Sequence, residues 1–249
     1  MEYLHYGEII LMFQIDVAMT AALRPEIIER TLTSIRSKLH WAGGFNLIVD
    51  IASVGDKQYS QKQVEKGIRN YFPEAKVRIK KDSFQAEALK WTWRNSNSPY
   101  MLQWEDDWVL ERDIYLQDVM NKMKSWYGYI CFDRIKKSVL DYPGYKDHFV
   151  KTDHTIWERI KGKSLGGPPA LMKAEYVKAA LRLIDGTKCL DTMSHEPLTE
   201  TLLDNWGVAV YLREDGEGNL VRDIGKDWRK ERGLVMKKNT MRGVEWTKV

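Results

Sequence analysis

Three consecutive carboxylates, Glu105-Asp106-Asp107, stand between two apolar runs in the stretch PYMLQWEDDWVL, residues 99–110. Carboxylates this close repel one another and lose hydration beside hydrophobic segments, so their position needs an explanation. Carboxylate oxygens bind hard divalent cations, and Mg²⁺ commonly completes its coordination shell with substrate phosphates. The triplet is therefore a candidate site for Mg²⁺ or Mn²⁺ with a diphosphate. The alternative interpretation is a solvated acidic loop.

Alternating strands and helices are predicted before the triplet. Strands are expected at residues 13–20, 45–53, 76–79 and 100–104, and helices at 24–39, at 60–72 and from Asp82 or Ser83 onward, with Phe84, Ala88 and Trp91 on one face. Pro25 suits a first helical turn, and Ser60 with Gln63 predicts a capping box. The alternation predicts an α/β fold with a mostly parallel sheet, in which ligands bind at the carboxyl ends of the strands. The triplet falls at such an end.

The chain after residue 110 gives a looser pattern. It predicts a helix through Ile114, Val119, Met120, Met123 and Trp126, a strand at 127–132, a loop at 166–172 running into a helix, a helix at 196–206 and a strand at 207–212. Trp91 and Trp126 are expected in the core. Trp104 and Trp108 either pack in the core or stack on a sugar or base. No repeat or linker divides the chain, so one compact unit with a basic tail is expected.

Charge is unevenly distributed around the acidic triplet. Residues 57–94 carry ten Lys/Arg against four Asp/Glu, and residues from Arg213 onward carry ten against seven. This distribution suits a cation with its phosphates or an anionic polymer, and solvated surface charge is the simpler alternative. The sequence shows no secretory signal and no run long enough to be a transmembrane segment. Cys131 and Cys189 form neither a disulfide framework nor a zinc spacing, so a cytoplasmic location is expected.

Five segments in order resemble GT-A glycosyltransferases of the inverting family 2 kind. They are IDVAMTAALRPEIIERTLTSI, LIVDIASVGD, SFQAEALKWTWRNSNSPYMLQWEDDW, GGPPALMKAEYV and EPLTETLLDNWGVAVYL, which together span roughly residues 13–225. The resemblance implies a GT-A (Rossmann-like) α/β fold, with a mostly parallel sheet flanked by helices, in a single domain at residues 1–225. The nucleotide-sugar half is expected at about 1–110 and the acceptor half at about 111–225, followed by a basic C-terminal tail at 226–249.

The resemblance also implies roles for individual residues. The donor contacts that it implies are Thr20, Ala21, Arg24, Asp50 at the nucleobase, Asp56, Glu105 on the ribose side and Asp106. Asp107 is the implied ligand of the Mn²⁺ or Mg²⁺ ion, as in the family's DXD motif, and Glu105 and Asp223 are further candidates. Glu196 is the implied base that deprotonates the acceptor, with Glu200 and Asp191 next. Simpler roles stay open, since Asp50 could end a strand and Glu196 could cap a helix before Pro197.

The sequence departs from the family pattern at three places. Glu105 replaces the usual first Asp of the metal motif, Asp223 stands where a His is common, and IASVG lacks the Asn-Gly that often follows the base-binding Asp. The last departure leaves the nucleobase preference open.

The function implied by the resemblance is metal-dependent, inverting transfer of a hexose or pentose from a nucleotide-sugar, with a UDP-sugar expected, to an acceptor hydroxyl. The acceptor is either a saccharide or a hydroxymethylated DNA base, and the latter would make the protein a DNA modification enzyme. Two other classes are open. One is a nucleotidyltransferase, against which the glycine-free loop TAALRPE argues, and the other is a nucleic-acid binding protein without catalysis.

Overall fold

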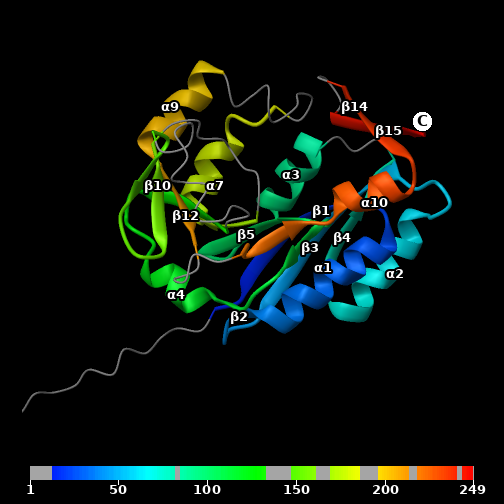
Figure 1. Cartoon of the computed structure of the whole chain (residues 1–249), viewed down its shortest axis with the longest axis horizontal. Helices are drawn as coiled ribbons and strands as arrows, with labels where there is room; N and C mark the ends of the chain where they lie inside the picture. Colours follow the sequence, from blue (N-terminus) through cyan, green and yellow to red (C-terminus); the bar gives the residue numbers. More distant parts are fainter. Residues whose placement is uncertain are drawn as a thin grey trace, which may run out of the picture.

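A nine-stranded sheet forms the centre of the protein (Figure 1). The computed structural model describes residues 13–81, 85–132, 147–160, 169–185, 196–212, 218–239 and 243–248. The strand order in the sheet is β4-β3-β1-β5-β11-β8-β12-β10-β9. The α/β fold expected from the alternating elements is confirmed.

The first half of the sheet is parallel throughout. Its strands are β1 (Ile15–Leu23), β3 (Phe45–Gly55), β4 (Lys76–Ile79) and β5 (Tyr100–Glu105), connected by α1 (Pro25–Lys38), α2 (Gln61–Tyr71) and α3 (Gln85–Arg94). Pro25 stands in the first turn of α1, as predicted. The predicted capping box is present, because Ser60 accepts from the Gln63 amide and the Gln63 side chain accepts from the Ser60 amide.

The second half of the sheet mixes strand directions. Its strands are β8 (Tyr127–Phe132), β9 (Phe149–Lys151), β10 (Ile156–Arg159), β11 (Ala170–Lys173) and β12 (Gly207–Tyr211), with α4 (Leu116–Asn121), α7 (Ala174–Leu181) and α9 (Pro197–Asn205) beside them. Residues 170–172 were expected in a loop and instead form β11, which pairs antiparallel with β5 and β8. The helix expected from Ile114 to Trp126 is only α4, and Trp126 is 51 % exposed rather than in the core.

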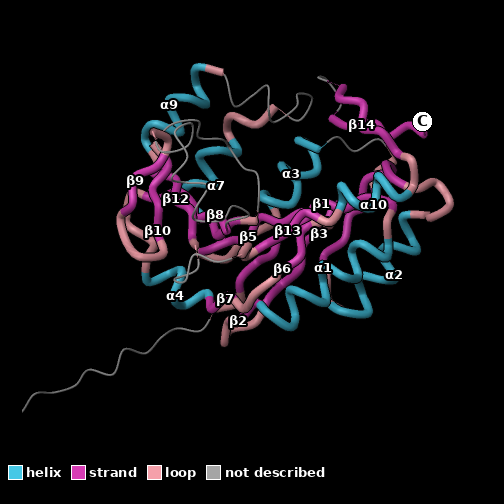
Figure 2. Tube along the Cα trace, viewed as in Figure 1, coloured by secondary structure: helices cyan, strands magenta, loops and turns pink. Residues whose placement is uncertain are grey.

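Helices cover both faces of this sheet (Figure 2). On one face, residues of α1 and α2 pack against side chains of β1 and β3, including Val17, Met19 and Val49. On the other face, Ala86, Leu89 and Trp93 of α3 pack with Ala18, Met101 and residues of α7. The two faces alternate along each strand because successive side chains of a strand point to opposite sides.

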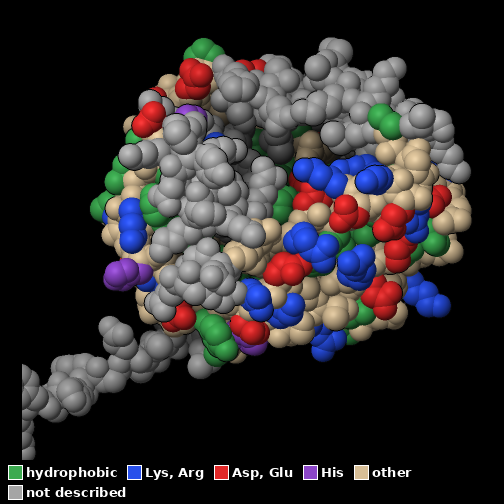
Figure 3. All heavy atoms as spheres, viewed as in Figure 1, with side chains coloured by type: hydrophobic (Ala, Val, Ile, Leu, Met, Phe, Trp, Pro, Cys, Tyr) green, Lys and Arg blue, Asp and Glu red, His purple; other side chains and the backbone are tan. Residues whose placement is uncertain are grey.

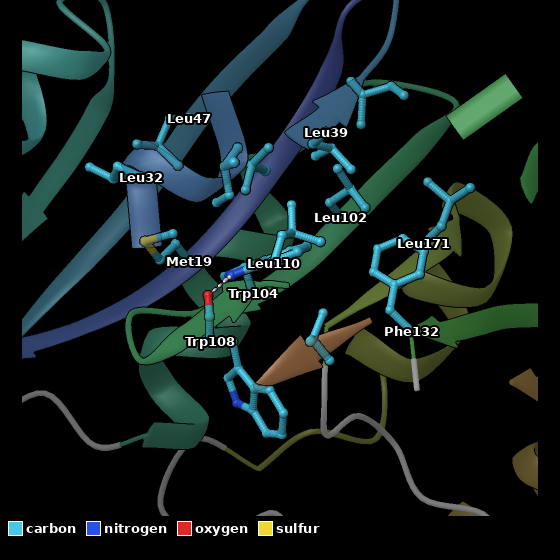
Figure 4. Packing of buried hydrophobic residues seen from close by; sticks show 14 of the residues in the cluster. Met19, Leu32, Leu39, Leu47, Leu102, Trp104, Trp108, Leu110, Phe132 and Leu171 are labelled. Carbon is cyan, nitrogen blue, oxygen red and sulfur yellow. Dashed lines mark hydrogen bonds between the residues drawn. The ribbon is translucent and has the colours of Figure 1, made fainter. Parts of the chain in front are cut away.

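Trp104 and Trp108 belong to the first of these cores (Figure 4). Their exposed fractions are 0 % and 5 %, and the Trp104 indole Nε1 donates to the Trp108 carbonyl oxygen over 2.9 Å. This bond closes the turn that contains the acidic triplet. The core interpretation of both tryptophans is therefore correct, and neither is available to stack on a ligand. Trp91, also expected in the core, is half-buried.

Three two-stranded sheets accompany the large one. They pair β2 (Leu39–His40) with β7 (Ile114–Tyr115), β6 (Trp108–Leu110) with β13 (Val221–Asp223), and β14 (Leu234–Asn239) with β15 (Gly243–Lys248). One of them, β6–β13, joins the C-terminal segment to the first half of the chain. Helix α10 (Gly225–Glu231) follows β13, and its Trp228 is buried against Ile27 and Val109. The expected tail at 226–249 thus contains a helix packed on the N-terminal half. No described helix has the length and apolar character that a membrane span requires.

Candidate active site

Four polar side chains form a row across the carboxyl ends of the parallel strands. Strand register places Arg78 of β4 opposite Asp50 of β3, Asp50 opposite Thr20 of β1, and Thr20 opposite Glu105 of β5. Residues two positions earlier, such as Ala18, pack under α3, so the row lies on the sheet face that α3 covers. The structure therefore brings together three predicted site residues and adds Arg78.

Asp50 is fully buried and is paired with Arg78. The Arg78 Nε donates to Asp50 Oδ2, and Arg78 Nη1 lies 3.4 Å from Glu87 Oε1. The guanidinium also lies 4.9 Å from the ring centroid of Trp91. Because the side chain of Arg78 is 22 % exposed and that of Asp50 is 0 % exposed, Arg78 is the accessible member of the pair.

Sequence reasoning missed Arg78 as a site residue. It stands in the run KVRIKK, whose residues 76–79 were predicted as a strand, but its charge was attributed only to the basic segment at 57–94. The signal that could have identified it is its place near the end of a predicted parallel strand, next to the strand that carries Asp50.

Asp106 anchors the acidic turn to the first strand and helix. Arg24 donates to it twice, from Nε to Oδ2 over 3.0 Å and from Nη2 to Oδ1 over 2.5 Å, and the Ala22 amide donates to Oδ2 over 2.9 Å. The Thr31 hydroxyl donates to the Asp106 carbonyl oxygen over 2.6 Å. Asp106 and Arg24 are 2 % and 5 % exposed, so the structure places both in a buried ion pair. Ala21, in the preceding strand, is buried in the core.

Asp107 has one paired oxygen and one that is not hydrogen-bonded. Its Oδ2 lies 3.0 Å from Arg24 Nη1 and 3.9 Å from Arg229 Nη1. Its Oδ1 is buried and has no hydrogen-bond partner among the described residues. Gly225 sits so close that a Cβ there would lie 2.1 Å from Asp107 Oδ2. An unsatisfied buried carboxylate oxygen is costly unless a cation or donor joins it, so Asp107 is chemically suited to a metal ion.

Protonation equilibria reflect the crowding of these carboxylates. Burial, followed by repulsion from Asp107 and Asp106, raises the pKa of Glu105 to about 8, although Arg24 opposes the shift. Gln85 Nε2 lies 3.3 Å from Glu105 Oε1 and can donate to it. Burial lowers the pKa of Arg24, but Asp106 and Asp107 outweigh burial and raise it above its ordinary value. Arg24 is therefore a permanent cation inside this turn.

Asp56 and Asp223 lie on the flanks of the site. The Asp56 carboxylate is 3.8 Å from Arg232 Nε, and the Asp223 carboxylate accepts from the Gly225 amide over 2.9 Å. Asp223 pairs with Trp108 across the β6–β13 ladder, which places it beside the triplet. Among the described residues, no three Asp, Glu, His or Cys side chains form a ready metal centre. A site completed by substrate phosphates and water needs only one or two protein carboxylates, so the residues present still fit a divalent ion.

The predicted bases belong to the second half of the sheet or lie outside the described residues. Glu196 is the N-cap residue of α9, which packs on α7 and β12, and its side chain makes no capping hydrogen bond. Its carbonyl oxygen accepts from the Thr199 and Glu200 amides. Glu200 is exposed one turn further along α9. Asp191 lies outside the described residues.

The molecular surface near α1 and α10 carries interspersed acidic and basic side chains, and a hollow lies above them in the view of Figure 3. A cavity of about 190 Å³ is lined by Arg30, Arg222, Ile224, Asp227, Trp228 and Glu231. None of the predicted site residues lines that cavity, so it is distinct from the row described above.

Comparison with solved structures identifies the architecture. No model of a known protein family and no curated protein sequence matches the chain. The mannosyltransferase PcManGT from Pyrobaculum calidifontis, in complex with GDP-Man and Mn²⁺, is similar with a TM-score of 0.52 at 12 % identity, over 79 % of this chain and 56 % of that chain. TarS 1-349 of S. aureus in complex with UDP-GlcNAc is similar with a TM-score of 0.52 at 10 % identity, over 83 % of this chain and 57 % of that chain.

The structure with UDP bound, also of TarS 1-349, gives a TM-score of 0.51 at 10 % identity, over 83 % of this chain and 59 % of that chain. The chain thus spans a little over half the length of the glycosyltransferase structures to which it is similar. The resemblance stated from the sequence is confirmed at the level of architecture: the chain has the GT-A fold.

Proposed function

We propose that the protein is a glycosyltransferase that moves a sugar from a nucleotide-sugar donor to an acceptor hydroxyl. The observation that carries this proposal is the polar row from Arg78 to Glu105, with Asp107 beside it, at the carboxyl ends of the parallel strands of a GT-A fold. Ligands of open α/β sheets bind at this edge. PcManGT in complex with GDP-Man and Mn²⁺, and TarS in complex with UDP-GlcNAc, support a nucleotide-sugar as the donor.

The Asp50–Arg78 pair is the proposed nucleobase contact. Asp50 and Glu87 contribute two negative charges, and Arg78 and Lys80 contribute two positive charges, so the cluster is neutral as a whole. A neutral cluster suits an uncharged base better than a phosphate. Arg78 donates to carbonyl oxygens of the base while Asp50 orients its guanidinium. Uracil and guanine both present such oxygens, so donors with either base are included in the test.

Asp107 is the proposed metal ligand, with Asp223 as a second candidate, and Glu105 and Thr20, next to Asp50 in the row, are the proposed contacts of the ribose. When a divalent cation is bound, it neutralises the charge that develops on the leaving diphosphate. Arg24 and Asp106 contribute by holding the turn in place, since their side chains are committed to each other.

Glu196 is the proposed general base, with Glu200 and Asp191 as the other candidates. In the proposed step the carboxylate takes the proton of the acceptor hydroxyl, the acceptor oxygen attacks the anomeric carbon, and the bond from that carbon to the phosphate oxygen breaks. A single displacement of this kind inverts the anomeric configuration. The acceptor is a saccharide or a hydroxymethylated DNA base. DNA is an anionic acceptor, and it is included in the test because three lysines are exposed on and just after the edge strand β4: Lys76, Lys80 and Lys81.

Donor consumption by Asp107→Asn tests the proposal. UDP- and GDP-sugars are offered with Mn²⁺, Mg²⁺ or EDTA, together with simple glycans and hydroxymethylated DNA, and products are read by mass spectrometry. We expect the wild type to consume one donor only with a divalent cation, and Asp107→Asn to lose on the order of 100-fold or more of that rate. The control is Asp118→Asn, an exposed carboxylate on α4. No turnover by the wild type, or full metal-independent turnover by Asp107→Asn, contradicts the proposal.

A further inference from the structure

The hairpin β14–β15 lies at the nucleobase end of the candidate site. Its strands pair antiparallel along their whole length, β15 contacts α3 and β3, and β14 contacts α10. Figure 1 shows the hairpin at the upper right, beside α3 and α10. Strand β3 carries Asp50, and α3 carries Glu87 and Trp91, which lie next to Arg78. The hairpin therefore borders two of the three elements that form the proposed nucleobase contact.

The start of the hairpin is anchored to the N-terminal half of the chain. Arg232, at the end of α10, pairs with Glu26 of α1, and its Nε lies 3.8 Å from Asp56 Oδ2, just beyond the end of β3. The Arg232 guanidinium also lies 4.5 Å from the ring centroid of Trp228. Leu234, the first residue of β14, packs against the apolar cluster that contains Trp228. These contacts fix where the hairpin begins relative to α1 and β3.

Beyond this anchor the hairpin depends on its surroundings. Within the part of the chain that the structure describes, β14 and β15 pair only with each other. A two-stranded hairpin is marginally stable in water unless it packs against another surface. Gly233, between α10 and β14, has a φ of +61°, a left-handed conformation that a residue with a Cβ adopts only at a cost. The hairpin is thus joined to α10 through one left-handed residue, and its stability depends on the surface that it contacts.

We propose that the hairpin β14–β15 closes over the nucleobase at the Asp50–Arg78 pair, so that the bound base and the packed hairpin stabilise each other. The inference rests on the proposed function and adds an element to its donor site. A planar base held at this pair exposes ring surface on the side away from the sheet, and burial of such surface is favourable. The hairpin, in contact with α3 and β3, is placed to cover it. Because a ligand stabilises a conformation only through its preference for that conformation, the base and not the diphosphate should order the hairpin.

Hydrogen exchange measured on the whole chain tests the closure. The amides of β14 and β15 are followed in the free protein, with UDP or GDP plus Mn²⁺, and with pyrophosphate plus Mn²⁺, each at a saturating concentration established by calorimetry. We expect exchange in the hairpin to slow roughly tenfold with the nucleotide that binds, and to stay unchanged with pyrophosphate, which lacks the base. The antiparallel pair β9–β10, at the opposite edge of the large sheet from β4, is the internal control and should not change.

Substitutions at Gly233 test whether the position of the hairpin matters for affinity. Gly233→Val places a β-branched residue at a left-handed position, and we expect the nucleotide affinity to fall roughly fivefold to thirtyfold. Gly233→Asn should keep near wild-type affinity, because asparagine tolerates this conformation. Gly218→Val is the matched control. Gly218 is also exposed, has a φ of +72°, and at either glycine no atom lies within 4 Å of an added Cβ.

The outcomes separate the hairpin's role from the proposed function. If the wild type binds UDP or GDP while exchange in the hairpin stays unchanged, or slows as much with pyrophosphate, the inference is wrong and the proposed function stands. The same conclusion follows if Gly233→Val binds nucleotide as tightly as the wild type, or if Gly218→Val loses as much affinity as Gly233→Val. If the wild type binds neither UDP nor GDP with Mn²⁺, the proposed function is wrong, and the inference fails with it.

Discussion

Asp16 is a buried carboxylate with a structural role. It lies near the N-terminal end of β1, whereas the candidate site lies at the carboxyl ends of the strands. Its Oδ2 accepts from the Asn97 amide over 2.7 Å, the Ser98 amide over 2.9 Å and the Ser96 hydroxyl over 3.0 Å. Burial raises the pKa of Asp16, but these hydrogen bonds, together with one from Asn46, outweigh burial and lower it from its ordinary value. The charged form therefore stabilises the turn that leads from α3 into β5.

At the scale of this residue, we expect Asp16→Asn to reduce the free energy of unfolding by about 1–3 kcal/mol at pH 7. A lowered pKa in the folded state means that the stabilisation is present above the unfolded pKa, about 3.9, and is lost as pH falls through the folded value. The difference in the free energy of unfolding between wild type and variant should thus become smaller at low pH. Urea unfolding at pH 7 and in a descending pH series checks this, with exposed Asp118→Asn as control. If the difference in the free energy of unfolding stays constant down to the lowest pH, the charge of Asp16 does not contribute to stability.

The first residue of helix α10, Gly225, lies very close to the acidic turn. A Cβ at Gly225 would lie 2.1 Å from Asp107 Oδ2 and 2.7 Å from Arg24 Nη1. Real Cβ atoms do not approach other atoms so closely, so any larger residue forces either α10 or the Asp107 side chain to move. Glycine is required here for proximity and not for an unusual backbone angle, because Gly225 is not among the residues with positive φ.

For this element, we expect Gly225→Ala to weaken Mn²⁺-dependent nucleotide binding and to lower stability by about 1–3 kcal/mol, the usual cost of overpacking. The matched control is Gly67→Ala on α2, where no atom lies within 4 Å of the added Cβ. That change should leave binding intact and raise stability by roughly 0.5–1 kcal/mol, since alanine is the better helix former. Calorimetric nucleotide titration and thermal unfolding measure the two effects. Equal behaviour of the two variants in the titration would show that α10 does not constrain Asp107.

On the scale of the whole molecule, the C-terminal segment returns to the N-terminal half of the sheet. Trp228 packs against Ile27 of α1 and Val109 of β6, and its Nε1 donates to Glu26 Oε1 over 2.6 Å. Arg232 extends the same connection to Glu26 and Asp56. These contacts join segments about two hundred residues apart in the chain.

We therefore expect Trp228→Ala to destabilise the whole fold, by roughly 3–5 kcal/mol, and not only the segment that carries it. Native-state hydrogen exchange provides the measurement, since a global effect lowers the protection of β1 and β3 along with that of α10. Trp126→Ala, at an exposed position, is the control and should leave protection unchanged. Loss of protection confined to residues 221–239 would mean that the C-terminal segment is an independent tail, as the sequence alone suggested.

Local sequence patterns determined much of the architecture. Hydrophobic runs of strand length alternating with helical periodicity predicted β1, β3, β4 and β5 and the helices that connect them, and the position of Glu105–Asp107 at a strand end followed from the same pattern. Residues 170–172 were wrongly predicted as part of a loop, because so short an apolar run shows no periodicity of its own, and only its pairing with β5 and β8 makes it a strand. The sequence also left open whether Trp104 packs in the core or stacks on a ligand, because only the tertiary structure shows what surrounds its side chain.

The partners of the charged residues were decided only by the tertiary structure. The sequence identified Asp50, Arg24 and Asp107 as candidates, but it did not reveal that Asp50 faces Arg78, that Arg24 belongs to Asp106, or that Arg229 returns to Asp107. Strand and helix signals arise from neighbours within a few residues, whereas an ion pair depends on how strands far apart in the chain come into register. The chemistry available at the strand ends could thus be read from the sequence, and its arrangement could not, because arrangement is a property of packing.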